Sequence, residues 1–339
     1  MAFESCKAPH WWETATDKMK PAVKITLLLV AAVLAVVLAQ RLYHQPHSQQ
    51  GGRVAATPAT NSATGHLPIA PLAKSAPGPV PTTPAVVPEW LKPVLAPVPG
   101  SSFADRVKVL RARTANLADD EIKALYSYLL TPAHSDNESR SDENWLRNVM
   151  LDRLTQQPNL PAGLAVVLIS IYQDPQQDVV MRDYAIQHIN PAYDRANTDD
   201  KAALNLVLWQ AAGETDSSIA GTALLALSDL ARSNAEFDRD QIAQTALKLA
   251  GDDNCGELAR ITAVQLCGQM GVQQASALIQ QLARQTGSIP LRISAIAALG
   301  NLGDQGAETF LQEIAAGSED RLKPAAETAL KRLKKRLGT

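Results

Sequence analysis

The chain has 339 residues, of which 46% are hydrophobic and only 4% aromatic, and its formal net charge is −2. Residues 1–100 carry eight Lys and Arg against four Asp and Glu, while residues 101–339 carry 24 against 30. The small aromatic content disfavours β-sheets, and the acidic second part repels nucleic acid. We therefore expect an all-α protein that binds no nucleic acid.

The first predicted element is a transmembrane helix at residues 22–40. Its centre, ITLLLVAAVLAVVLA at residues 25–39, has no charged residue, and about 18 helical residues reach roughly 27 Å, close to the thickness of a bilayer's hydrocarbon core. Three lysines lie shortly before this run and only Arg41 follows it closely, so the positive-inside rule predicts a cytosolic segment at residues 1–21. We expect a single-pass protein of the cytoplasmic (inner) membrane whose remaining residues are periplasmic or otherwise extracytoplasmic.

A cleavable signal peptide is the alternative for this segment, because Val37-Leu38-Ala39 fits a small-residue cleavage site. The region before the apolar run contains Trp11 and Trp12, and it is long and mixed in charge for a signal peptide. This favours an uncleaved signal anchor. Both alternatives place the following residues outside the cytosol.

Residues 41–100 are predicted to form a Pro/Ala-rich disordered linker. Twelve prolines lie in this range, with only five Lys, Arg, Asp and Glu. Proline removes backbone donors, and short Ala/Val clusters bury too little area to offset the loss of chain entropy. We expect a semi-stiff, polyproline-like spacer, with recognition of its PxxP motifs by a partner as the alternative.

Residues 101–339 contain an internal repeat. Segments that begin 31 to 40 residues apart share a small or apolar residue three positions after the start and an apolar or small residue seven positions after it. The segments begin at Arg147, Arg182, Ala220, Arg260, Arg292 and Lys323. This spacing predicts first helices that pack closely through one buried face. The residues expected on that face are Met150, Ala185, Ala223, Ala263, Ala295 and Ala326.

A second amphipathic helix is predicted after each of the first five segments. These second helices lie at residues 162–172, 199–212, 240–250, 273–285 and 304–315. A further pair at residues 103–115 and 119–130 opens the array. The repeat domain is therefore predicted to span residues 101–339.

The segment RISAIAALGNLGDQGAETFLQEIA at residues 292–315 resembles a HEAT repeat of the kind also found in phycobilin-lyase-like proteins. Residues 260–283 are similar, and the resemblance extends over residues 140–336. It implies a curved HEAT-like α-solenoid, here of about six to seven helix pairs, whose second helices line one face. It implies no reaction. Ala220 departs from the basic residue of the pattern, which interrupts any ladder of arginine contacts there.

No pattern typical of a catalytic, cofactor-binding or metal site occurs in residues 101–339. We interpret His188 as a partly exposed helix residue and His134 as part of a solvated loop at residues 131–144. Cys255 and Cys267 are expected to be separate buried thiols. The basic residues crowded at the C-terminal end are expected to complement the helix terminus. We expect no enzymatic activity, no cofactor, no metal and no small-molecule substrate.

Polar side chains on the predicted second helices form the candidate partner-binding face, together with one tryptophan that also fits a core position. The candidates are Asn205, Trp209, Gln244, Lys248, Gln273, Gln274, Gln280, Gln281, Glu308 and Gln312. The leading functional hypothesis is a membrane-tethered extracytoplasmic scaffold that binds one or more protein partners. The alternatives are an accessory factor or chaperone that assists an enzyme or a modified protein, and a protein that binds cell-wall polymer.

Overall fold

The computed structural model describes residues 87–96, 100–113, 116–132, 137–285 and 287–338. The predicted cytosolic segment, the membrane span at residues 22–40 and most of the linker lie outside these ranges. Among the helices that the structure describes, none combines the length and the apolar character that a bilayer span requires.

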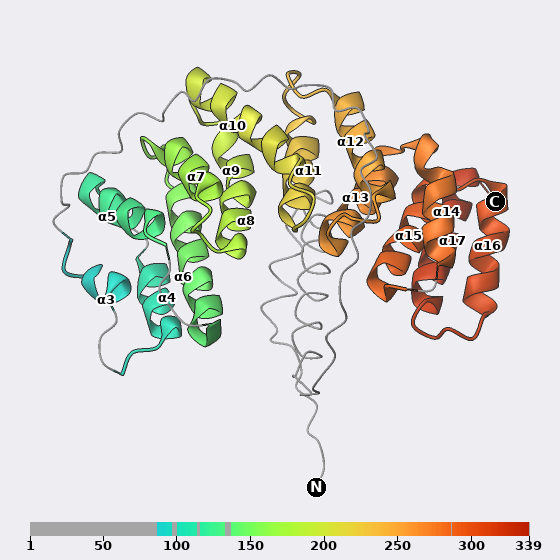
Figure 1. The fold of residues 1–339 in the computed structure, drawn as a ribbon, viewed down its shortest axis with the longest axis horizontal. Coiled ribbons are helices and arrows are strands. Elements are labelled where there is room, and N and C mark those ends of the chain that lie inside the picture. Colours follow the sequence, from blue (N-terminus) through green and yellow to red (C-terminus); the bar gives the residue numbers. More distant parts are fainter. Residues whose placement is uncertain (1–86, 97–99, 114–115, 133–136, 286, 339) are drawn as a thin grey trace, which may run out of the picture. The chain divides into compact units, whose positions relative to one another are not determined.

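The described residues form helices and connections without a strand, so the all-α prediction is confirmed for them (Figure 1). The helices are α3 (Lys92–Leu95), α4 (Phe103–Ala112), α5 (Asp119–Leu130), α6 (Asn137–Thr155), α7 (Leu164–Gln173), α8 (Val179–Gln187), α9 (Ile189–Tyr193), α10 (Thr198–Ala212), α11 (Ile219–Leu230), α12 (Arg239–Gly251), α13 (Glu257–Met270), the 3₁₀ helix η1 (Gln273–Ala275), α14 (Ser276–Arg284), α15 (Ile289–Leu302), α16 (Gln305–Ala316) and α17 (Lys323–Leu337). We call α4, α6, α8, α11, α13, α15 and α17 the first helices, and α5, α7, α10, α12, α14 and α16 the second helices.

The bounds of the second helices agree with the predicted ones to within two residues, except that α14 begins three residues late because residues 273–275 form the 3₁₀ helix η1. Local capping signals mark where several of these helices begin. The side chains of Asn197, Asp238 and Asp304 accept hydrogen bonds from backbone N–H groups in the first turns of α10, α12 and α16. Such a cap satisfies donors that have no partner within the helix. The starts of these helices were therefore predictable from short sequence windows.

The helix α6 begins earlier than predicted, inside the expected loop at residues 131–144. Two side-chain contacts accompany this longer helix. Arg147 Nη2 lies 2.7 Å from Glu143 Oε1, one helical turn away, and Asn144 Nδ2 donates to Asp178 Oδ1 at 2.8 Å. These contacts favour a helix in a segment whose composition is typical of a loop. The loop prediction is wrong from residue 137 onward.

The folded array begins before residue 101, inside the range predicted as linker. Leu91 and Val94, on either side of the start of α3, are fully buried. The side chain of Arg106 in α4 donates from Nε to the Val94 carbonyl at 2.7 Å. Residues 87–96 therefore pack as part of the array, and the predicted boundary at residue 100 differs from the observed one.

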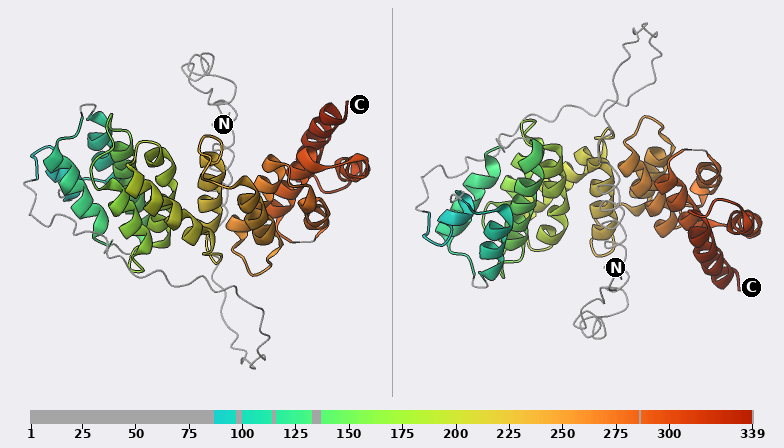
Figure 2. Two further views of the ribbon diagram at one scale, coloured as in Figure 1. Left: turned by 90° about the horizontal axis from the view of Figure 1, so that it is seen from above. Right: turned by 90° about the horizontal axis from the view of Figure 1, so that it is seen from below.

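Each first helix packs on the next one from α4 to α17, and this continuous layer can be followed in Figures 1 and 2. From α7 onward, each second helix packs most extensively on the first helix that follows it: α7 on α8, α10 on α11, α12 on α13, α14 on α15 and α16 on α17. The sequence pattern had paired each first helix with the second helix after it. From α7 onward, the helices that pack as a hairpin are therefore a second helix and the first helix after it, and not a first helix and the second helix after it.

Small residues allow the first helices to approach closely. A Cβ atom added at Gly268 of α13 would lie 2.8 Å from Ala298 Cβ of α15, and one added at Gly300 would lie 2.9 Å from Ala329 Cα of α17. The six residues predicted to face the core, from Met150 to Ala326, are all fully buried. The predicted register of the repeat is therefore confirmed.

Candidate functional site

Arginines of the first helices bind the carboxyl-terminal ends of the preceding second helices. The Nε atom of Arg182 donates a hydrogen bond to the Tyr172 carbonyl at 2.7 Å. In the same way, Arg260 Nε donates to the Ala250 carbonyl at 2.9 Å, and Arg292 Nε donates to the Ala283 carbonyl at 3.2 Å. Arg147 reaches the end of α5 in the same way through Nη1, at 2.7 Å from the Thr131 carbonyl. These cations satisfy carbonyls that have no partner within their own helix.

Most of these arginines also form an ion pair with a carboxylate. Arg182 pairs with Glu214 at 2.8 Å and Arg260 with Asp253 at 2.6 Å. Arg292 holds both carboxylate oxygens of Glu319, at 2.6 and 2.9 Å. The basic residue that recurs in the sequence pattern is therefore explained by helix capping and ion pairing within the array.

The repeat unit that begins at Ala220 has no arginine at this position, so the series of arginine contacts is interrupted there, as the sequence predicted. Ala220 is fully buried at the start of α11. The neighbouring Gly221 brings α11 against α13, since a Cβ atom there would lie 3.0 Å from Ala259 Cα. A backbone hydrogen bond from Gly256 N to Thr215 O, at 2.7 Å, joins the connections before these two helices.

The structure divides the ten candidate partner-binding residues into two groups. Gln244, Lys248, Gln273, Gln274, Gln281 and Gln312 are exposed, whereas Asn205, Trp209, Gln280 and Glu308 are partly buried. Trp209 packs against the hydrophobic core. Glu308 accepts a hydrogen bond from Gln312 Nε2 at 3.2 Å and lies 3.4 Å from Lys334 Nζ.

These candidates do not form one packed surface. The second helices α12, α14 and α16 that carry most of them pack on first helices rather than extensively on one another. The first helices, by contrast, form a continuous layer. Sequence reasoning missed this difference because it depends on which helices meet in space.

His188 is buried rather than partly exposed, which corrects the sequence-based interpretation. Its Nε2 atom lies 2.9 Å from Asn148 Oδ1 of α6 and 3.9 Å from Asp152 Oδ1. Burial lowers the pKa of His188 from 6.5 to about 4, so the ring is neutral at pH 7. It lies between α8 and α9 and contributes a polar contact to α6.

A half-buried carboxylate lies between the first helices α8 and α11. Asp183 Oδ2 accepts a hydrogen bond from Ser218 Oγ at 2.6 Å. Burial raises the pKa of Asp183, because the charged form loses hydration. This hydrogen bond joins α8 to the residue that precedes α11.

The two thiols in the described part of the chain are free and buried, as predicted. Burial raises the pKa of Cys267 to about 12, which keeps it a thiol at neutral pH. Among the described residues there is no group of three or more His, Cys, Asp or Glu that could hold a metal ion.

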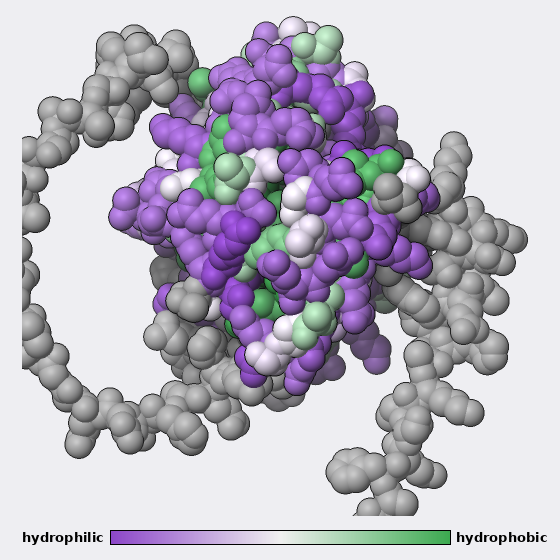
Figure 3. Space-filling model, turned by 90° about the vertical axis from the view of Figure 1, so that its right-hand side faces the viewer, coloured by the Kyte–Doolittle hydropathy of each residue, from purple (hydrophilic) through white to green (hydrophobic). Residues whose placement is uncertain are grey.

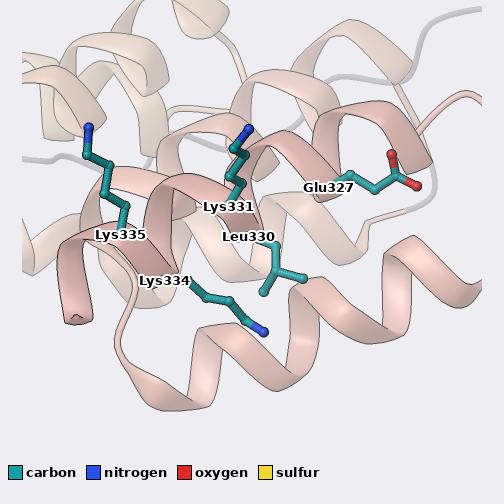
Figure 4. Close-up of a pocket in the computed structure, with 5 residues that line it drawn as sticks. All are labelled: Glu327, Leu330, Lys331, Lys334 and Lys335. Carbon is teal, nitrogen blue, oxygen red and sulfur yellow. The ribbon is translucent and has the colours of Figure 1, made fainter. Parts of the chain in front are cut away.

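The basic residues of α17 point in different directions (Figure 4). Lys334 and Leu330 extend toward one side, and Lys331 and Lys335 toward the other. These four residues and Glu327 line an open surface depression. Lys334 pairs with Glu308, and Arg336 donates to the Gly303 carbonyl at the end of α15. The contact of Arg336 is at a helix end, as predicted for this basic segment, whereas Lys334 pairs with a carboxylate in the first turn of α16.

Residues 243–331, from α12 into α17, match a protein-family model described as HEAT repeats. No significant match was found among curated proteins or among solved structures. The match names nothing finer than HEAT repeats, so the likeness to phycobilin-lyase-like proteins stays a prediction. The family match and the all-helical array together show that this part of the chain is a HEAT-repeat helical solenoid.

Proposed function

We propose that the chain is a membrane-tethered scaffold outside the cytosol that binds protein partners through its HEAT-like solenoid. The observation that supports this best is the uninterrupted layer of first helices from α4 to α17, each packed on the next. HEAT repeats commonly serve in protein–protein interaction. Because stacked helices are preorganised, they offer a long contact surface that loses little conformational entropy on binding. The chain has no catalytic role in this proposal.

The first helices carry most of the exposed large apolar side chains in the part of the chain that the structure describes. Trp145, Val180, Leu225 and Leu258 lie on α6, α8, α11 and α13, and between 37% and 43% of each residue is exposed. Arg111 stacks over the Trp145 ring, with its Cζ atom 5.7 Å from the ring centroid. Aromatic, large apolar and arginine side chains contribute most to typical protein interfaces. We propose the first helices as the main contact side, with the glutamines of the second helices as the alternative.

Site-specific photo-crosslinking in cells tests this function and separates the two sides. A photoreactive amino acid replaces Leu225 on α11 in one variant and Gln281 on α14 in another. Ala235, exposed in the connection before α12, provides the control position. We expect a discrete crosslinked protein from Leu225 and none from Ala235. Crosslinks from Gln281 alone would assign binding to the second helices, and folded variants that crosslink to nothing would contradict the scaffold function.

The anchor at residues 22–40 and the following proline-rich segment complete the proposal. The 46 residues between the anchor and residue 87 would reach on the order of 140 Å if fully extended at about 3.1 Å per residue. We predict that a reporter active only in the cytosol stays inactive when it is fused after Thr339, and that protein of full mass stays in the membrane fraction. An active reporter would contradict the orientation, and a shortened soluble product would favour a cleaved signal peptide.

A further inference from the structure

The segment before α4 occupies the position of a second helix. In α8, α13 and α15 the fourth residue is an arginine, and its Nε atom donates to the carbonyl of the penultimate residue of the preceding second helix. The fourth residue of α4 is Arg106, and its Nε atom donates to the carbonyl of Val94, the penultimate residue of α3. The pair of α3 and α4 therefore has the same register as the pairs that follow it.

The second helix of this pair is cut to a single turn. The helix α3 has four residues, whereas α7, α12 and α14 have 10, 13 and nine. Pro93 is tolerated in the first turn of α3, but Pro88 disfavours a longer helix, because its ring would clash with the preceding turn. Figure 1 shows this short helix beside α4. We call residues 87–96 the strap.

Few apolar side chains hold the strap. Leu91 and Val94 are fully buried, whereas Glu89 and Lys92 are exposed. The helix α3 packs on α4, while α7 packs on α5, α8 and α10. A segment with few buried apolar contacts opens at a lower free energy than helices that pack on several neighbours. The strap is therefore expected to open before the rest of the array.

The polar groups that hold the strap keep other partners when it leaves. Trp90 Nε1 donates to Glu121 Oε1 at 2.5 Å. Glu121 also pairs with Arg113 at 3.1 Å, and it accepts a hydrogen bond at 2.8 Å from the backbone N–H that precedes α5. Arg106 Nη2 donates to Tyr128 Oη at 2.9 Å. Opening therefore leaves neither charge buried without a partner, a state that would be costly.

A released strap finds no equivalent apolar site at the end of the array that carries α16 and α17. Figure 3 faces this end, where hydrophilic residues cover most of the surface and apolar residues form only small separate areas. Because Leu91 and Val94 need a contiguous apolar surface to become buried, the strap is expected to return to α4.

We propose that residues 87–96 are a releasable strap, which detaches from α4 and α5 while the following helices stay folded, and docks again afterwards. Release adds these residues to the spacer, which gains about 31 Å if they extend fully at about 3.1 Å each. Tension on the preceding residues favours release, because the detached strap is longer than the docked one. The detachment follows from the contacts of the strap, and its use in extending the tether rests on the proposed membrane anchor.

Hydrogen exchange of the purified full chain in detergent micelles, measured by mass spectrometry, tests the release. The backbone N–H groups of Val94 and Leu95 donate to the Leu91 carbonyl, so the docked strap is protected. We expect these amides to exchange at least about 100-fold faster than those of α15, and at least about tenfold slower than in an unfolded chain. Leu91→Ser should speed exchange in the strap about tenfold and leave α15 unchanged.

Two further variants define what the result means. Val180→Ser removes an exposed apolar side chain from α8 and is expected to leave the strap unchanged. Arg292→Ala destabilises the array at α15, and a strap that opens independently keeps its exchange rate in this variant. Equal protection of strap and α15, or equal acceleration of both by Leu91→Ser or Arg292→Ala, would overturn the proposal, because the strap would then open only with the array.

Exchange of the strap as in an unfolded chain would overturn the proposal as well, because residues 87–96 would then not be docked. These measurements involve neither a partner nor a lipid bilayer. Failure of the scaffold function would therefore leave their result unaffected, and failure of the strap would leave the scaffold function unaffected.

Discussion

Single residues in the core of the repeats determine whether the array folds. Ala295 is fully buried in α15, next to the fully buried Ile296. We predict that Ala295→Asp lowers the free energy of unfolding by about 3–5 kcal/mol, because it buries a carboxylate without a partner. Chemical denaturation followed by circular dichroism measures the change. Ala277→Asp, at an exposed position of α14, is the matched control and is expected to cost less than about 1 kcal/mol.

A second effect at the residue scale is the acid sensitivity that His188 introduces. Its pKa is lowered from 6.5 to about 4 by burial, so the unfolded chain takes up a proton first as the pH falls. Stability from this residue is present above about pH 6.5 and is lost as the pH falls toward 4. Between pH 7 and pH 5 the loss is about 2 kcal/mol.

The variant His188→Gln isolates this contribution, since glutamine is polar but does not titrate. We expect its stability to change less than that of the original chain between pH 7 and pH 5. Burial raises the pKa values of Asp152, Asp183 and Asp229, so these carboxyl groups increase the free energy of unfolding as the pH falls further. The difference in stability between the original chain and the variant is therefore the quantity that reports on His188. Equal pH profiles would contradict the buried, neutral state of His188.

At the scale of helices, the arginine contacts connect α5, α7, α12 and α14 to the first helix that follows each of them. Arg292 is 9% exposed and joins the end of α14 to Glu319 in the connection before α17. We predict that Arg292→Ala lowers the free energy of unfolding by about 2–3 kcal/mol, because a buried carbonyl and a carboxylate lose charge-assisted hydrogen bonds. Arg292→Lys is expected to lose part of this, since lysine lacks the planar fork.

The control for this prediction is Arg332→Ala in α17. Arg332 is exposed, and its Nη1 atom lies 3.5 Å from Asn301 Oδ1, so we expect a loss below about 1 kcal/mol. Equal losses from the two alanine variants, measured by denaturation, would show that the recurring arginine has no special structural role.

The limits of sequence-based prediction are clearest at the same scale. Helix starts were predictable because caps such as Asp238 and Asp304 act within one turn. The pairing of α7 with α8 was not, because it depends on contacts between helices. The packing of Leu91 and Val94 was hidden in a segment whose prolines are typical of a linker, and their burial depends on the apolar side of α4.

The candidate binding residues show a similar limit. Helical periodicity identified exposed glutamines such as Gln244 and Gln281 on second helices. It left open whether Trp209 contacts a partner or the core, and the structure places it partly buried against the core. Exposed anchors on first helices, such as Leu225, gave no sequence signal, because an apolar residue in an apolar helix is usually buried.

For the whole molecule, the length of the proline-rich segment is the property that we expect to matter, and not its sequence. Because residues 87–96 belong to the folded array, the segment to test is residues 46–86. Replacing it with an unrelated flexible linker of equal length should leave function in cells unchanged. Shortening it to about ten residues should impair function in cells, since the tether then limits which positions the solenoid can reach.

The same variants separate reach from affinity when the partner identified by crosslinking is added to purified protein. Affinity should be equal for the original, replaced and shortened chains, because the contact surface lies in the folded helices and the spacer contributes few specific contacts. The opposite result is a partner that binds a peptide of residues 46–86 but not the folded residues 87–339. That result would make the proline-rich segment the ligand and the solenoid its support, and the scaffold proposal would have to be abandoned.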